Sequence, residues 1–247
     1  MTRLPYKPQS TSPRHGVARV ISKEGRGSRS QATRWVLEGR VSVNGVVVRD
    51  PDFSTRQGID RIDIDGEQVH TAARRVLMLN KPRGLVTTTS DEKGRETVYR
   101  CFDGANLPWL APVGRLDKAS EGLLLFSNDP AWAAQVTDPE RGPTKTYHVQ
   151  VNDLVSDIQL QQMIEGVQVE DEYLSVQDAR LLRVGHKNAW LELVLAEGRN
   201  RQIRRLLSAC ELEVLRLIRV SVGPLVLGDL QKGAWRWLSD SEVAELV

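Results

Sequence analysis

The segment GRLDKASEGLLLFSND, residues 114–129, carries the pattern on which the interpretation of this chain depends. It places Arg115 and Asp117 in a loop that starts with a glycine and leads straight into the apolar run 123–126. Functional side chains often lie on a loop that a rigid scaffold positions. An ionised carboxylate can act as nucleophile or base without a cofactor, and a nearby arginine can bind phosphate. An aspartate before a strand also commonly caps a turn, so the tetrapeptide alone leaves both roles open.

The composition is typical of a folded protein that does not span a membrane. The 247 residues suffice for a medium domain and a small one, each with its own core. Charged residues make up 27% and hydrophobic residues 40%, and no apolar run approaches the roughly 18 residues that a membrane span needs. Residues 1–14 are polar and contain three prolines. We therefore expect a disordered tail there, no secretory signal, and a cytoplasmic protein.

Cysteine and histidine spacing indicates neither a disulfide framework nor a metal site. Cys101 and Cys210 lie far apart, and the four histidines are scattered without triad or metal-ligand spacing. The chain also has no phosphate-binding glycine loop and no dinucleotide fingerprint. We expect no metal and no small-molecule cofactor.

The basic charge is concentrated at the start of the chain. Residues 1–75 contain 14 Lys/Arg and 8 Asp/Glu, whereas the remainder contains 20 and 24. Within residues 1–49 the count is 10 basic to 2 acidic. Such a concentration on a small unit is typical of a nucleic-acid-binding domain, although a solvated basic surface fits the same counts.

Residues 15–71 predict a small domain of two helices and two hairpins. A first helix has a short apolar stripe and stops at Gly25, and a second runs from about Ser30 to Glu38. Asn44-Gly45 and Asp65-Gly66 each lie between runs of valine or isoleucine. Both dipeptides are strong signals for a tight β-hairpin turn.

The run SRSQA at 28–32, followed by EGRVSVNG at 38–45, resembles the small αL RNA-binding domain first known from a ribosomal small-subunit protein. The resemblance implies that the second helix, with Arg29 and Arg34, and Arg40 beside its end, binds the phosphates of structured RNA. The planar guanidinium fork of arginine suits this contact. Phosphate contacts give affinity and position rather than sequence choice, so the domain would deliver the rest of the protein to its target.

The larger part of the chain contains three further patterned segments. Residues 76–79 predict a buried strand that runs into Lys81-Pro82-Arg83-Gly84, where proline and glycine end regular structure. Residues 145–151 alternate, with Tyr147 on the same face as two valines. A tyrosine among valines is also common in a half-buried core strand.

The third segment is a strand at 190–195 followed by a predicted helix over 200–210, for which Asn200 is the expected N-cap. Arg201, Arg204 and Arg205 crowd the start of this helix. The helix macrodipole is already positive there, so each extra cation is unfavourable by roughly 0.3–1 kcal/mol. The arrangement predicts an anionic partner, which is an acidic side chain, an RNA phosphate, or one of each.

Five motifs follow one another in chain order: NKP at 80–82, GRLD at 114–117, KTY at 145–147, EGRNRQIRR at 197–205 and LIR at 217–219. In this order they resemble the bacterial ribosomal RNA pseudouridine synthases of the RsuA-like family, which commonly carry the αL domain in front. The resemblance spans nearly the whole chain after residue 15. Even the segment 223–238 is similar to the closing segment of that family.

The resemblance implies a catalytic role for three residues. Asp117 would be the essential carboxylate, which attacks or deprotonates the ribose of a flipped uridine so that the base detaches, turns and rejoins through carbon. Tyr147 would stack on the displaced uracil. Arg204 would pair with Asp117 and keep its carboxylate ionised and correctly aimed.

The resemblance also implies a set of RNA contacts. Arg115 would fill the gap that the flipped base leaves, because an arginine plane can both stack and donate hydrogen bonds. Lys145 is a candidate for the phosphate beside the flipped nucleotide. Taking a base out of a stack costs a few kcal/mol, and Arg199, Arg201 and Arg205, with the basic front domain, would supply the compensating contacts to the RNA backbone.

We therefore expect an α+β protein: the αL domain at 15–71, a linker at 72–75, and a catalytic domain at 76–247 with a mostly antiparallel mixed sheet flanked by helices. The expected function is conversion of a specific uridine in ribosomal RNA to pseudouridine, with the large subunit favoured and the small subunit open. The expected partner of this monomer is ribosomal RNA or a ribosome assembly intermediate.

Two other functions fit part of the same pattern. A non-catalytic RNA-binding or ribosome-assembly factor would show the same charge, hairpins and arginines. A hydrolase or nuclease that uses Asp117 with Glu121 is less favoured, because no second carboxylate or metal-ligand set recurs near the other motifs. Removal of the charge of Asp117 distinguishes a catalytic protein from a binding protein, because catalysis requires that charge and RNA binding does not.

Overall fold

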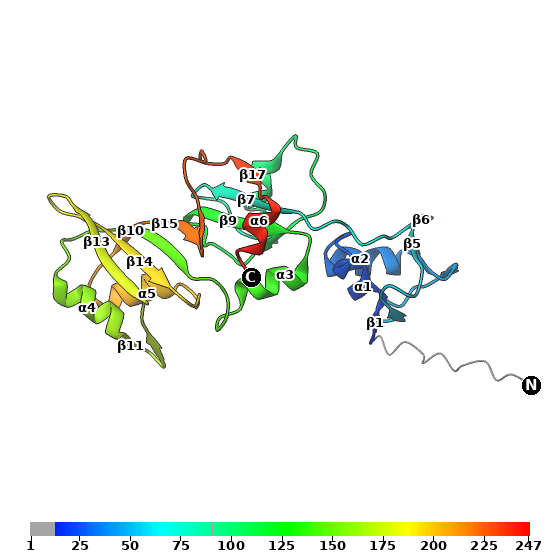
Figure 1. Cartoon of the computed structure of the whole chain (residues 1–247), viewed down its shortest axis with the longest axis horizontal. Coiled ribbons are helices and arrows are strands. Elements are labelled where there is room, and N and C mark those ends of the chain that lie inside the picture. The colour runs from blue at the N-terminus through cyan, green and yellow to red at the C-terminus, as the bar shows by residue number, and fades with distance from the viewer. Residues whose placement is uncertain (1–12, 90) are drawn as a thin grey trace, which may run out of the picture. The chain divides into compact units, whose positions relative to one another are not determined.

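The computed structural model describes residues 13–89 and 91–247, and the chain divides into two compact units, Met1–Ala73 and Arg74–Val247 (Figure 1). Most of the tail that we expected at 1–14 lies outside the described residues. Each unit encloses its own hydrophobic core. No helix in the described part of the chain is both long and apolar enough to cross a membrane.

The first unit contains both predicted helices and both predicted hairpins. The elements are β1 (Arg14–Gly16), α1 (Val17–Lys23), α2 (Arg29–Leu37), β2 (Val41–Val43), β3 (Val46–Val47), β4 (Ser54–Arg56), β5 (Ile62–Ile64) and β6 (Glu67–Gln68). The order in the four-stranded sheet is β3-β2-β5-β6. Asn44 and Asp65 have φ values of 52° and 53° and each precedes a glycine of positive φ, which is the backbone of a type I′ hairpin turn.

Helix α2 has the local signals that start and end a helix. The Ser28 hydroxyl accepts from the backbone N–H of Gln31, and the Gln31 side chain accepts from the backbone N–H of Ser28, which forms a capping box. Gly39 follows the helix with a φ of 74°. Ala32 and Val36 are buried against α1, so the opposite face of α2, which carries Arg29 and Arg34, is exposed.

The second unit is built on one nine-stranded sheet. The path through it is β13-β14-β10-β15-β9-β7-β17, with β16 beside β15 and β8 beside β9. The strands are β7 (Val76–Lys81), β8 (Ala111–Val113), β9 (Glu121–Ser127), β10 (Lys145–Val151), β13 (Asp178–Val184), β14 (Ala189–Leu195), β15 (Val214–Val222), β16 (Leu225–Val226) and β17 (Trp235–Trp237). Every pair is antiparallel except β15 with β9. The mostly antiparallel mixed sheet that we expected is confirmed.

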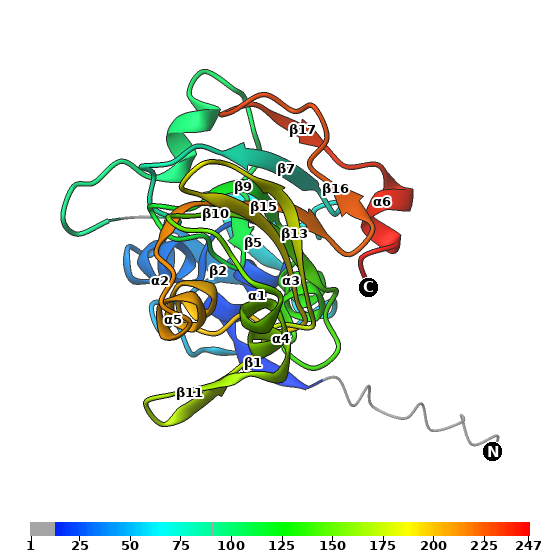
Figure 2. The ribbon, with the colours of Figure 1, turned by 90° about the vertical axis from the view of Figure 1, so that its left-hand side faces the viewer.

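Helices cover different parts of this sheet. They are α3 (Pro130–Thr137), α4 (Asp157–Glu165), α5 (Gln202–Ala209) and α6 (Asp240–Ala244), with a 3₁₀ turn at Val98–Phe102 and a separate hairpin of β11 (Val167–Val169) and β12 (Glu172–Leu174). Helices α4 and α5 lie on the same side of β10, β13 and β14 (Figures 1 and 2). Helices α3 and α6 pack against β7 and β9.

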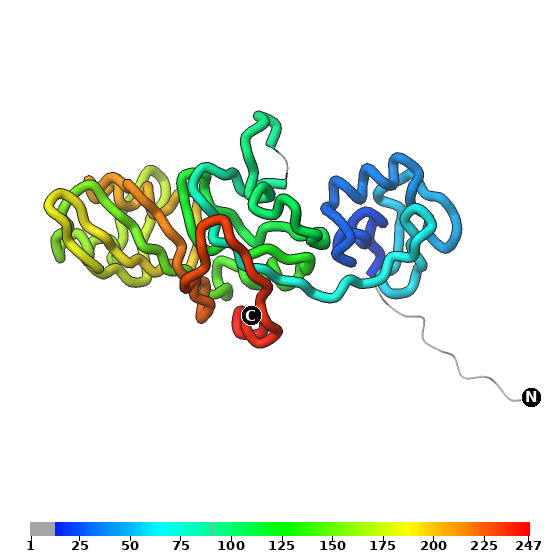
Figure 3. Tube along the Cα trace, turned by 90° about the horizontal axis from the view of Figure 1, so that it is seen from above, coloured from blue at the N-terminus to red at the C-terminus, as the bar shows by residue number. Residues whose placement is uncertain are grey.

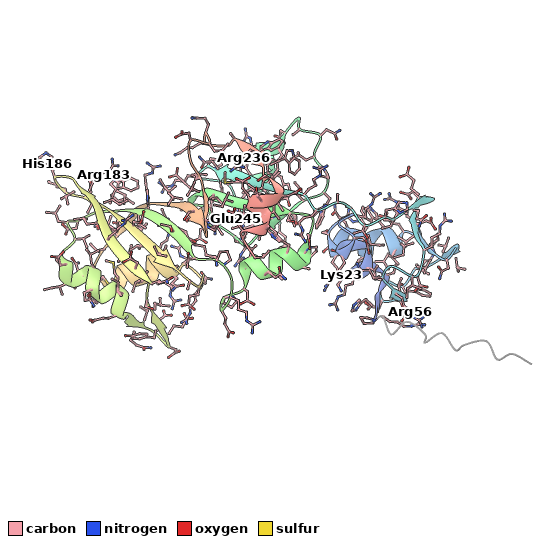
Figure 4. All side chains as sticks on the ribbon, in the orientation of Figure 1. Lys23, Arg56, Arg183, His186, Arg236 and Glu245 are labelled. Atoms are coloured by element: carbon pink, nitrogen blue, oxygen red, sulfur yellow. The ribbon has the colours of Figure 1, made fainter. Side chains whose placement is uncertain are left out.

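The two edges of the sheet are formed by β17 and β13. The C-terminal segment, red in Figure 3, supplies β17, which pairs with β7 at one edge. At the other end, Arg183 projects from the β13–β14 hairpin (Figure 4), and its guanidinium carbon lies 4.8 Å from the ring centre of Trp190. Trp190 alternates with the core residues of β14, so this contact lies on the face opposite α4 and α5.

The parallel junction of β15 and β9 is short and depends on one glycine. It comprises two residue pairs, Ile218 with Glu121 and Arg219 with Gly122. Gly122 has a φ of 101°, and a Cβ placed on it would lie 2.2 Å from the backbone oxygen of Arg219. Only glycine fits this approach of the two backbones. Because the pairing stops there, β9 and β15 separate beyond Gly122.

The substitution Gly122→Ala should therefore destabilise the second unit by more than about 3 kcal/mol, because it combines a strained φ with a backbone clash. Gly84→Ala is the matched control: Gly84 has a φ of 102°, and no atom lies within 4 Å of the place that an added Cβ would take. It should cost about 1–2 kcal/mol. Denaturant unfolding of the two variants measures this, and equal losses would contradict the role of the close approach.

Candidate active site

A cavity of about 380 Å³ lies in the second unit and brings together most of the residues that the sequence indicated. Its functional lining consists of Arg115, Asp117, Lys145, Tyr147, Arg199, Arg201, Arg204 and Arg219. Apolar walls come from Leu195, Ile203 and Leu217. Asp117, Tyr147 and Arg204 thus share one pocket although they come from three separate segments of the chain. A pocket with apolar walls and a few convergent charged groups is typical of a substrate site.

The loop that carries Asp117 is fixed through its backbone by a buried lysine. Lys81 ends strand β7 and is fully buried, and its Nζ donates to the carbonyl oxygens of Pro82 at 3.1 Å, Asp117 at 3.1 Å and Ser120 at 2.8 Å. Three acceptors match the three protons of an ammonium group. Burial lowers the pKa of Lys81 to about 8, and the nearby Asp117 and Glu121 oppose that shift.

Two more contacts from the segment after Lys81 hold the same loop. The hydroxyl of Thr87 donates to the carbonyl of Leu116 at 2.7 Å and lies 3.3 Å from its backbone nitrogen. The backbone N–H of Gly84 donates to the carbonyl of Lys118 at 2.7 Å. The segment from Gly84 to Thr87 therefore supports the Asp117 loop.

The contact that Asp117 makes differs from the expected one. A terminal nitrogen of Arg201 lies 3.6 Å from its carboxylate, and the side chain remains 43% exposed. Arg204 forms no ion pair with Asp117 within the described residues. It donates to the carbonyls of Val214 at 3.3 Å and Ala119 at 3.4 Å, so it contacts the loop two residues beyond Asp117.

Arg204 is nevertheless near enough to the Asp117 carboxylate for the two charges to interact. Burial, and then the neighbouring Arg201, lower the pKa of Arg204, whereas Asp117 raises it. The Nε atom of Arg204 is buried without a hydrogen-bond partner in the described structure. Two guanidinium groups thus lie near Asp117: that of Arg201 contacts its carboxylate, and that of Arg204 contacts the carbonyl of Ala119 in the same loop.

The expected N-cap of helix α5 was wrong. The helix starts one residue later than Asn200 would require, with Arg201 at the cap in the left-handed conformation, at a φ of 48°. The side chain of Gln202 accepts from the backbone N–H of Arg199 at 3.0 Å and donates to the carbonyl of Ser175 at 3.0 Å. Buried Gln202 therefore organises the turn that precedes α5.

The other arginines near α5 are held by the protein itself. Arg205 forms ion pairs with Glu172 and Glu170. Arg199 pairs with Glu197 at 3.0 Å and also donates to the carbonyl of Tyr173 at 3.0 Å. Of the three arginines whose crowding predicted an anionic partner, Arg205 thus pairs with Glu172 and Glu170, and Arg201 with Asp117, so both partners are acidic side chains of the protein.

Tyr147 and Lys145 lie on strand β10 and line the cavity. Tyr147 is partly buried and packs against the core under α4 and α5, and it lies directly opposite Arg219 of β15 in the antiparallel register. Lys145 donates weakly to the carbonyl of Ala196 at 3.5 Å. Burial lowers the pKa of Lys145, and the charge of Arg219 adds to that effect.

The remaining predicted RNA contacts differ in how free their charges are. Arg115 is exposed at the mouth of the cavity, and Arg29 and Arg34 are exposed on α2. No ion pair holds any of these three within the described ranges. Arg40 is different, because its guanidinium bonds to Asp65 at 2.9 Å and pairs with Glu38. Its charge is neutralised within the domain.

The comparisons with known proteins agree with this geometry. Residues 75–209 match the model of the family described as RNA pseudouridylate synthase, and residues 17–58 match the S4 domain. The chain belongs to the RNA pseudouridine synthases. The family and the enzyme class that the sequence resembled are confirmed. The expected αL RNA-binding domain is confirmed as well, because the S4 domain is that domain.

Relatives of this pseudouridine synthase extend over almost the whole chain. An RNA pseudouridine synthase of Aquifex aeolicus, itself uncharacterised, is 35% identical over 232 residues, which are 93% of this chain and 92% of the relative. The ribosomal large subunit pseudouridine synthase B of Bacillus subtilis is 34% identical over 93% of this chain and 94% of its own. A crystal structure of a pseudouridylate synthase superposes with a TM-score of 0.66 and 31% identity, covering 96% of this chain and all of the other.

The buried lysine makes a prediction about pH. The folded-state pKa of Lys81 is about 8, below its ordinary value of 10.5, so the unfolded state binds more protons between these two values. The free energy of unfolding should therefore rise with pH from about 8 to 10.5, by at most about 1.4 kcal/mol per pH unit. Lys81→Met should reduce this rise and leave the part that Lys145, whose pKa is also lowered, contributes, whereas Lys118→Met, on the exposed part of the same loop, should keep it in full. Denaturant unfolding at several pH values measures it; an undiminished rise in Lys81→Met would contradict the assignment.

Proposed function

We propose that this pseudouridine synthase isomerises a specific uridine of ribosomal RNA, favouring the large subunit, either in free RNA or in an assembly intermediate. The observation that carries the proposal is the meeting of Asp117, Tyr147 and two arginines in one cavity. The choice of ribosomal RNA is supported by relatives of this chain from Bacillus subtilis and Haemophilus influenzae, which are named ribosomal large subunit pseudouridine synthase B.

In this proposal Asp117 acts on the ribose of the flipped uridine, by attack on the sugar or by removal of a proton from it. The bond between C1′ and N1 breaks, the base turns, and a bond forms between C1′ and C5. The C5 proton leaves and N1 takes up a proton, so the net reaction is an isomerisation. The contact of Arg201 orients the carboxylate, while Arg204 fixes the adjacent loop through Ala119. This division of roles replaces the single Arg204 pair expected from the sequence.

The other residues of the cavity hold the substrate. Tyr147 offers an aromatic face to the detached uracil, and its phenol lies near enough to the reacting base to assist proton removal. Arg115 is unpaired at the mouth and fills the stack that the base has left. Lys145 binds the phosphate beside the flipped nucleotide. Extrusion of a base costs a few kcal/mol, which these contacts and those of the first unit offset.

Asp117→Asn tests the catalytic role. The amide keeps the size of the side chain but removes its charge, so pseudouridine formation should fall at least about 1,000-fold, while RNA affinity changes less than about threefold. Asp103→Asn, an exposed residue of the same unit, is the matched control and should retain activity. Chemical mapping of pseudouridine in ribosomal RNA transcripts gives the readout. Undiminished product from Asp117→Asn would refute the proposal.

The first unit should contribute phosphate contacts through Arg29 and Arg34. Replacing both with glutamine should lower RNA affinity and reduce the slope of log K against log salt by about 1.4–1.8, because each lost phosphate contact contributes about 0.7–0.9. Arg40→Gln is the control, since Asp65 and Glu38 already neutralise that guanidinium, and it should change the slope by less than about 0.5. Filter binding at several salt concentrations measures this. An equal change in both variants would show that intramolecular pairing does not decide which arginines bind RNA.

A further inference from the structure

Arg219 is a buried cation that the reaction scheme above leaves unused. It lies on β15, is 7% exposed, and lines the same cavity as Asp117 and Tyr147. Within the described residues no carboxylate lies in ion-pair distance of it. A buried charge without a partner is costly and usually has a ligand or a functional reason.

The backbone places Arg219 at the point where the sheet separates. Its backbone pairs with Gly122 of β9 on one side and with Tyr147 of β10 on the other. Its Nε donates to the carbonyl of Leu123 at 2.7 Å, immediately beyond the last residue pair of β9 and β15. That hydrogen bond fixes the plane of the guanidinium group.

The terminal nitrogens of this guanidinium remain for a ligand. The only hydrogen bond that Arg219 makes to described residues through its side chain uses Nε, and neither terminal nitrogen is among the buried atoms without a partner. They therefore border the cavity. Opposite residues of an antiparallel pair project from the same face of a sheet, so Arg219 and Tyr147 reach the cavity from the same face, with the guanidinium turned toward β9 by its bond to Leu123.

The reaction creates a negative charge at that place. When the bond between C1′ and N1 breaks, its electron pair goes to the uracil, and the charge spreads to the two carbonyl oxygens of the base. A base that stacks on Tyr147 presents its edge to the neighbouring side chain on the sheet, which is Arg219. A pre-positioned donor in a site of low dielectric stabilises developing charge strongly, and removal of one such donor typically costs 100- to 1,000-fold in rate.

Given the function proposed above, we propose that Arg219 is a catalytic residue that donates hydrogen bonds to a carbonyl oxygen of the uracil and stabilises the base as it leaves the ribose. The electron pair returns when C5 of the uracil bonds to C1′, so Arg219 gains and loses no proton. Lys145 is more exposed than Arg219 and is the first residue of β10. It keeps its separate role at the phosphate.

The leaving ability of the base provides the test. Fluorine at C5 withdraws electrons and stabilises the detached uracil, so cleavage of 5-fluorouridine should depend less on Arg219. Single-turnover rates of C1′–N1 cleavage and rejoining through C5 are measured for Arg219→Lys and Arg219→Gln on a ribosomal RNA transcript made with uridine or with 5-fluorouridine, because the fluorinated base has no C5 proton to release and does not go on to pseudouridine. We expect Arg219→Gln to lose about 100-fold or more with uridine and less than about 10-fold with 5-fluorouridine, with Arg219→Lys in between.

The ratio of the two rates is insensitive to partial unfolding, because both substrates are converted by the same preparation. Arg216→Gln is the matched control, since Arg216 lies on the same strand and pairs with Glu121; it should change both rates by one factor. Equal losses for Arg219→Gln on both substrates would overturn the proposal in favour of a structural role. Weaker binding with an unchanged single-turnover rate and a smaller salt slope would overturn it in favour of a phosphate contact.

The same experiment separates this proposal from the one on which it rests. If the unaltered protein forms no pseudouridine in any ribosomal transcript, the proposed substrate is wrong. If it forms pseudouridine and the two substrates respond alike to Arg219→Gln, the substrate stands and only the role of Arg219 fails.

Discussion

The site depends on one buried ammonium group, that of Lys81. It binds carbonyl oxygens of the chain rather than side chains, so it fixes the backbone of Asp117 and Ser120 directly. Hydrogen bonds from a charged donor are stronger than neutral ones, and burial makes their loss costly. The Asp117 side chain, which is 43% exposed, thus lies on a rigid loop without being held by a tight partner of its own among the described residues.

The cavity beside that loop results from an interruption of the sheet. Gly122 permits β15 to approach β9 for two residue pairs only, after which the strands separate and Arg219 satisfies the carbonyl of Leu123 that pairing would have used. The left-handed backbone of Arg201 and the unpartnered Nε of Arg204 lie around the same cavity. Local departures from regular structure concentrate at functional sites, where the surrounding fold compensates for them.

Some arginines of this protein form ion pairs with its own carboxylates and others do not, so the number of basic residues does not by itself give the charge available to a ligand. Arg40 and Arg205 are held by carboxylates, whereas Arg29, Arg34 and Arg115 face solvent. The count of basic residues in the first 49 positions therefore overstates the charge that is free to bind a ligand. Phosphate contacts set affinity and register, so under the proposed function the arginines without an ion pair in the described structure are the ones expected to supply them.

The sequence by itself determined the helices and hairpins of the first unit, the strands near 76–79, 145–151 and 190–195, and the family, because periodicity, turn chemistry and the order of motifs are local patterns. It did not indicate α3, α4, α6 or the β11–β12 hairpin. Only the tertiary structure decided that Arg201 rather than Arg204 contacts Asp117, that Gln202 replaces Asn200 in ordering the start of α5, and that Lys81 and Thr87 hold the Asp117 loop. The physical reason is that each of these contacts joins segments distant in the chain, or depends on a single backbone dihedral angle, and neither leaves a periodic trace in the residues.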